Sequence, residues 1–217
     1  MRNIIYSSLL SVFILLTISG CANNVYYAGM EKVGFHKRDI MINRVENVQE
    51  SQKDAQEEFK SALDQFGTLV NLEDTDLKAT YEKFNNEYED AKDAANELTT
   101  NIDKLENVSL ALFEEWEEEL DLYKNKSLRA QSAEKLKITK SKYDTMMKSM
   151  RKSEKSMNPI LETFQDNVLT LKHSLNAQAI GTLQGEFTTL KKEINILIKQ
   201  MNSSISESNK FIKESQL

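Results

Sequence analysis

The chain has 217 residues, of which 40% are hydrophobic and 29% are charged, and its net charge is −6. Its six glycines and one proline exclude folds that need frequent turns, such as β-sandwiches, so the composition predicts long helices. The acidic balance excludes a general nucleic-acid binder, because contacts to phosphate need a basic face.

The first 21 residues, MRNIIYSSLLSVFILLTISGC, have the organisation of a secretory leader. Arg2 precedes an apolar core of roughly fifteen residues, which is shorter than the about twenty residues of a comfortable membrane span. The end of this segment, Ile18-Ser19-Gly20-Cys21, resembles a bacterial lipobox. We therefore expect cleavage between Gly20 and Cys21, and lipid attachment at Cys21, the only cysteine of the chain.

The lipobox resemblance implies a mature chain that starts at Cys21 and carries three acyl chains. Each buried methylene contributes about 0.8 kcal/mol, so several chains hold a protein stably on a bilayer. In lipoproteins of this type an Asp after the cysteine favours the inner membrane. Ala22 stands at that position, which favours the periplasmic face of the outer membrane. The alternatives are an ordinary secretory signal with a chance cysteine, or an uncleaved anchor.

Beyond a lipidated tether over 21–32, the remaining residues, 33–217, form one domain with helical periodicity. The first stripe of core positions repeats at alternating spacings of three and four residues, which is the pattern of a coiled-coil helix. Its members are Val45, Val48, Gln52, Ala55, Phe59, Ala62, Phe66 and Leu69. The stripe breaks at 70–74, where Asn71 favours a stop and Asp74 and Asp76 favour the start of the next helix.

Three further stripes follow along the chain. The second predicts a helix of about fifty residues, running from Leu77 through Trp116 to Tyr123. A turn at 125–127, with Ser127 as N-cap, leads to a third helix through Met157 and, past Pro159, to Leu175. Pro159 predicts either a kink or a helix start. After a turn at 176–178, the last stripe begins at Ile180 and fades towards Phe211.

These elements predict an all-α fold, an elongated antiparallel coiled-coil-like four-helix bundle. Because the middle two helices are the longest, a two-helix tip around 113–137 should project from the end where the chain enters the bundle. Residues 73–121 carry 17 acidic and 4 basic side chains, whereas residues 124–155 carry 11 basic and 3 acidic ones. Opposite charge on adjacent antiparallel helices favours this pairing.

The candidate partner contacts lie at the start of the first helix, near the membrane, and in the predicted tip. His36, Lys37 and Arg38 open the first helix, Trp116 stands among five glutamates, and Lys126 lies in the turn. For each the plainer interpretation is structural: a solvated helix start, or a core tryptophan with solvated acids around it. His173 should lie at the far end of the bundle from His36, so the two histidines make no metal site.

Two further motifs have both a binding and a packing interpretation. Met146, Met147, Met150 and Met157 could form an adaptable hydrophobe-binding face, but at helical spacing they are typical of a core. Gly181 and Gly185 predict close helix packing. The chain has no Gly-rich phosphate loop and no HExxH motif, so we expect no enzyme, no catalytic residues, no cofactor and no metal.

Three segments carry a resemblance to a known family: YYAGMEKVGFHKRDIMINRVENVQESQKDAQEEF (26–59), ALFEEWEEEL (111–120) and LKHSLNAQAIGTLQGE (171–186). They resemble an uncharacterised domain-of-unknown-function family of helical lipoproteins from gammaproteobacteria, over about 26–213. The resemblance implies the same fold and leader, and it carries over no known activity, cofactor or catalytic residue.

Two functions remain open from the sequence. The first is a periplasmic lipoprotein that acts as a structural or adaptor protein of the cell envelope and binds an envelope protein. The second is a module that opens its bundle to bind lipids or unfolded proteins. No nucleic-acid partner is expected, and heptads do not decide the oligomeric state, because they bury equally well within one chain or between chains.

Overall fold

In the computed structural model the described residues are 36–71, 77–173 and 177–215. They form four helices: α3 (Lys37–Val70), α4 (Leu77–Leu120), α5 (Lys126–His173) and α6 (Ala177–Ser215). The predicted all-α class is confirmed. No helix in these three ranges is long and apolar enough to cross a membrane.

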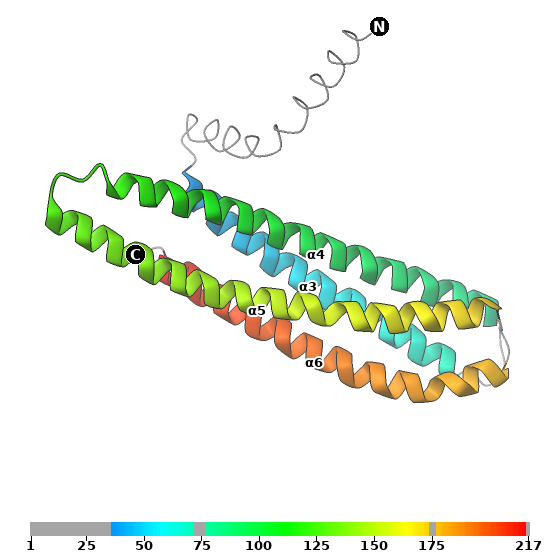
Figure 1. Ribbon diagram of the computed structural model, residues 1–217. Coiled ribbons are helices and arrows are strands. Elements are labelled where there is room, and N and C mark those ends of the chain that lie inside the picture. Colours follow the sequence, from blue (N-terminus) through cyan, green and yellow to red (C-terminus); the bar gives the residue numbers. More distant parts are fainter. Residues whose placement is uncertain (1–35, 72–76, 174–176, 216–217) are drawn as a thin grey trace, which may run out of the picture.

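The four helices run antiparallel to their sequence neighbours in an elongated bundle (Figure 1). Each helix packs against the next one in the chain, and α6 packs back onto α3 to close the ring. Short connections between long helices leave little choice but this up-and-down arrangement.

The predicted stripes form the core. Every member of the first stripe is buried, from Val45 to Leu69, and so are the methionines that the sequence left open between a core and a binding role. The buried members of the other stripes are Phe84, Tyr88, Ala91, Ala95, Leu98, Ile102, Leu105, Leu136, Tyr143, Phe164, Val168, Leu171, Ile180, Leu183, Leu190, Ile194, Leu197, Met201 and Phe211. Heptad spacing therefore predicted both the helices and the faces they bury.

A layer of phenylalanines joins all four helices near the end away from the tip. Phe66 of α3 stacks on Phe84 of α4, with ring centroids 5.0 Å apart. The rings of Phe164 on α5 and Phe187 on α6 meet Phe66 edge-on, at 6.5 and 6.0 Å. Such stacked and edge-to-face contacts add to the area that the rings bury.

A second layer, in the middle of the bundle, is polar. The Gln52 side chain is fully buried, and its Nε2 donates hydrogen bonds to Ser153 Oγ at 3.1 Å and Ser204 Oγ at 3.0 Å. Next to it, Asn101 Nδ2 donates to Ser51 Oγ at 2.7 Å. Two side chains of α3 and one from each of the other three helices thus belong to this layer, which we call the polar layer. A polar group at a core position typically specifies register at a cost in stability.

The structure corrects two details of the sequence prediction around α5. Its N-cap is Asn125, not Ser127: Asn125 Oδ1 accepts hydrogen bonds from the backbone N–H of Ser127 and Leu128, at 2.9 and 3.2 Å. Asn is as favourable an N-cap as Ser, which explains why the helix begins two residues earlier than predicted. Pro159 lies inside α5 and does not start a new helix.

The prediction that Gly181 and Gly185 pack closely against another helix is wrong. A Cβ at either position would meet nothing within 4 Å, whereas at Gly67 it would come within 2.9 Å of the Phe187 ring. The close approach therefore occurs between α3 and α6, at a glycine that no local pattern distinguishes.

Replacing Gly181 or Gly185 by alanine should raise the free energy of unfolding by about 0.5–1 kcal/mol, because glycine is a poor helix former and the added methyl group meets open space. Urea denaturation followed by circular dichroism measures this. Gly67→Ala is the matched control: there the same gain in helix propensity is offset by the displaced Phe187 ring. Equal gains at Gly67 and Gly181 would contradict the packing described.

Some sequence predictions lie outside the described residues. These are the leader with Gly20 and Cys21, the tether over 21–32, the helix start at Asp74 and Asp76, and the turn before Ala177. They stay predictions.

Candidate functional site: the α4–α5 tip

The α4–α5 hairpin continues past the ends of both other helices, as predicted (Figure 1). Two ion pairs mark the positions beyond which α3 and α6 no longer pack against the hairpin. Lys37, the first residue of α3, pairs with Glu115 of α4 at 3.0 Å, and Lys142 of α5 pairs with Glu214 at the end of α6 at 2.8 Å. We call residues 116–141, beyond these pairs, the tip.

Contacts between the two helices hold the tip together. Trp116 Nε1 donates a hydrogen bond to Ser132 Oγ at 2.9 Å, and its partly buried ring packs against the core. Arg129 donates to the Leu120 carbonyl at 3.0 Å and to Asp121 Oδ1 at 2.8 Å, so it ties the start of α5 to the end of α4. Lys140 pairs with Glu117.

An aromatic cluster closes the core beneath the tip. The Phe113 and Tyr143 ring centroids lie 5.2 Å apart, and Phe211 of α6 meets Tyr143 at 6.3 Å. Burial raises the pKa of Tyr143 to about 12, because an apolar surrounding disfavours the phenolate. Closely packed, mostly buried aromatic side chains therefore lie directly below the tip.

Arg151 joins the acidic and basic helices below the tip. Its guanidinium contacts Asp103 at 2.6 Å and Glu106 at 2.5 Å on α4, and Glu154 at 3.1 Å on α5. Burial favours the neutral form, but the hydrogen bonds to Asp103, Glu106 and Glu154 outweigh it and raise the pKa of Arg151. The predicted attraction between α4 and α5 is thus realised as particular ion pairs.

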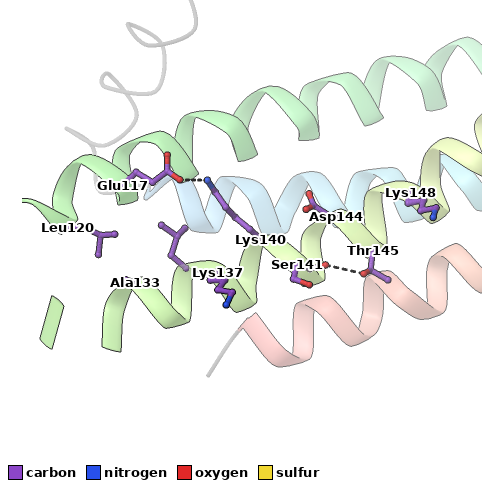
Figure 2. Close-up of a pocket in the computed structure, with 10 residues that line it drawn as sticks. Glu117, Leu120, Ala133, Lys137, Lys140, Ser141, Asp144, Thr145 and Lys148 are labelled. Carbon is purple, nitrogen blue, oxygen red and sulfur yellow. Dashed lines mark hydrogen bonds and ion pairs between the residues drawn. The ribbon is translucent and has the colours of Figure 1, made fainter. Parts of the chain in front are cut away.

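Residues of α4 and α5 line an open groove of about 630 Å³ at the hairpin (Figure 2). It runs from the tip along α5. Leu120, Ala133 and Leu136 form its apolar part. Its charged lining is Glu117, Lys137, Lys140, Asp144 and Lys148, and Lys140 is paired across it with Glu117. The sequence showed these residues only as a basic helix next to an acidic one, so the groove itself was missed.

The predicted contact residues gather at the tip end of the bundle, with different degrees of exposure. His36 is exposed at the N-cap position of α3, where its side chain makes no capping bond. The Lys37 side chain is only 10% exposed, because it is held by Glu115. Arg38 and Lys126 are exposed, and Trp116 is half-buried. His173 ends α5 at the opposite end, as predicted.

A cluster of carboxylates lies elsewhere on the bundle, across α3 and α4. Oxygens of Glu58, Glu87 and Asp90 lie within 4.8 Å of one another. Desolvation of Glu58, followed by repulsion from Asp90 and Glu87, raises the pKa of Glu58. Sequence spacing could not find this cluster, because it depends on the register between two helices.

Glu58→Gln should raise the free energy of unfolding at pH 7 by a few tenths of a kcal/mol, about 0.3, after allowing for solvent screening. Since the folded-state pKa is raised, the favourable contribution of protonated Glu58 is present below the unfolded pKa and lost as the pH rises through the folded pKa. The gain should therefore vanish near pH 4. Urea titrations at both pH values test this, with the exposed Glu46→Gln as control; a gain that persists at pH 4 would contradict it.

The fold and the tip define the protein as an elongated four-helix bundle that presents a two-helix extension. The family model DUF2959, described as a protein of unknown function, matches residues 26–215, and the chain belongs to this family. No curated protein and no solved structure matches the chain.

Proposed function

We propose that the protein is a lipid-anchored structural or adaptor protein of the bacterial cell envelope, attached through acyl chains on Cys21 to the periplasmic face of the outer membrane. The sequence support is the lipobox-like Ile18-Ser19-Gly20-Cys21 and the Ala22 that follows it. The observation that carries the adaptor role is the tip, where two helices leave the cover of the other two. No enzymatic activity is proposed.

The groove lined by Leu120, Lys137 and Lys140 is the surface we assign to an envelope protein partner. It offers apolar contact at the partly exposed Leu120 and Ala133, with lysines along its length. Interfaces of this kind combine a small apolar centre with a charged rim that selects the partner. With three lysines against Glu117 and Asp144, the groove favours a partner segment with acidic side chains.

Photo-crosslinking in living cells tests the adaptor role. A photoreactive residue at Lys137, in the groove, should give one discrete adduct with another protein, and a probe at exposed Lys199 on α6 should give none. The same pattern of adducts at both positions, or no adduct at Lys137, would contradict a specific partner at the groove.

A second candidate function is a module that opens its bundle to bind lipids or unfolded proteins, and buried polar atoms without a hydrogen-bond partner favour it. The buried atoms Gln52 Oε1, Gln56 Nε2 and Gln200 Oε1 have no hydrogen-bond partner among the described residues. Such groups lower the stability of a closed core.

A bundle that opens should bind an apolar dye under native conditions and exchange its core amides rapidly. Amides of Phe59 and Leu98 that exchange only through global unfolding would exclude this function.

A further inference from the structure

The apex of the tip carries a cluster of exposed apolar side chains. Leu122, Tyr123 and Leu128 are 78%, 41% and 50% exposed. Four other large apolar side chains of the described ranges are this exposed, and they are spread along the helices: Leu110, Ile138, Leu169 and Ile196. Scattered exposed leucines are ordinary, but three within seven positions form a patch.

The patch follows from the geometry of the tip. The three side chains come from the connection after α4 and from the first turn of α5, beyond the Lys37–Glu115 and Lys142–Glu214 pairs where α3 and α6 end. They therefore lie at the end of the hairpin, where neither α3 nor α6 covers them.

The charges next to the patch are of both signs: Glu119, at the end of α4, lines one hollow with Leu122 and Tyr123, whereas the side towards α5 is basic. Between 121 and 129 the chain has Lys124, Lys126 and Arg129 against Asp121, which Arg129 already holds at 2.8 Å. Lys124 and Lys126 are exposed and make no ion pair among the described residues. Lysines can lay their stems along apolar surface while the ammonium stays with phosphates, and tyrosine suits the boundary between lipid and water.

The apex also lies at the end of the bundle where α3 begins (Figure 1). Fifteen residues separate Cys21 from Lys37, and an extended chain of that length reaches about 50 Å. On α5, fourteen residues of helix run from Lys140, which pairs with Glu117, to Lys126 at the apex, and this is about 21 Å. A bilayer that holds Cys21 is therefore within reach of the apex.

We propose that the apex is a second membrane contact, in which Leu122, Tyr123 and Leu128 enter the interfacial region of a phospholipid bilayer and Lys124 and Lys126 face its phosphates. That a bilayer lies within reach of the apex depends on the proposed anchor at Cys21. The exposure of the patch and the charges next to it do not depend on that anchor. Burial of a small apolar area together with attraction of lysines to phosphate is the usual basis of peripheral membrane binding. Such a contact holds the bundle upright on the membrane, with the ends of α3 at Val70 and of α5 at His173 farthest from it.

The test uses the full chain, purified from bacterial membranes and reconstituted in vesicles of phosphatidylethanolamine and phosphatidylglycerol that contain a diazirine-bearing phospholipid. After illumination, mass spectrometry locates the lipid adducts along the chain. We expect adducts in peptides covering 122–128, and an about tenfold loss of them in the double variant Leu122→Glu, Leu128→Glu. The matched control is Leu169→Glu, Ile196→Glu, which changes two equally apolar exposed residues on the body and should leave the labelling unchanged. Circular dichroism melting checks that both variants fold.

The intact mass at Cys21, read in the same sample, separates the two proposals. Acylated Cys21 without adducts at 122–128, or equal labelling around Ile196, would overturn the membrane contact and leave the anchor in place. Adducts at 122–128 with an unmodified Cys21 would support the contact and refute the anchor. A crosslink from Tyr123 to another protein in cells, in place of lipid, would also overturn the proposal.

Discussion

Phe66→Ala is expected to lower the free energy of unfolding by about 3–5 kcal/mol. The Phe66 side chain is fully buried and its ring contacts Phe84, Phe164 and Phe187, one on each of the other helices. Truncation removes the ring's transfer free energy and leaves a cavity between four long helices that cannot all move inward. Urea denaturation followed by circular dichroism gives the value.

The matched control is Phe187→Ala, which removes the same side chain from the same layer where it is only partly buried. We expect a loss of no more than about 2 kcal/mol there, because part of the ring is already in contact with water. A loss at Phe66 as small as that at Phe187 would contradict a layer centred on Phe66.

Gln52→Leu is expected to raise the free energy of unfolding by about 1–2 kcal/mol. The buried Gln52 amide makes two hydrogen bonds to serines, while its Oε1 has no partner among the described residues. Leucine fills a similar volume without an unsatisfied polar atom. Ser153 keeps its own bond to the Met150 carbonyl, at 2.8 Å. A polar side chain in the core fixes the register between helices at a cost in stability. The Gln52→Leu variant should therefore also assemble less specifically.

Two further measurements complete this test. Gln52→Ala should destabilise the fold, since it removes the amide and also leaves a cavity. Sedimentation velocity of Gln52→Leu would show whether the chain now forms mixed oligomers. A destabilised Gln52→Leu would contradict the unsatisfied amide and would indicate a polar layer whose hydrogen bonds are complete.

The four helices could be predicted from the sequence because heptad spacing depends only on the local chain. Val45 to Leu69 repeat at the helical period and are all buried, and the scarcity of glycine and proline left no other class of fold. The tip followed from helix lengths alone. The sequence also predicted attraction between the two helices of the tip, because an acidic helix precedes a basic one.

The missed features depend on the register between helices, which no local pattern contains. Gly67 was overlooked because its neighbour, Phe187, is distant in sequence, and the exposed Gly181 was preferred for its spacing. Lys37 was expected at the surface, but its partner, Glu115, lies on another helix. The groove beside Lys137 needs two helices at a defined separation. Residue type and helical period predict which face of a helix is buried. Ion pairs between helices and grooves on the surface can be found only in the assembled bundle.

The central claim, a lipid-anchored protein that presents its tip, is tested most directly by the intact mass of the chain purified from cell membranes. The account predicts a chain that begins at Cys21 and carries three acyl chains on that residue. A chain that retains residues 1–20, or one with an unmodified Cys21 thiol, would contradict it.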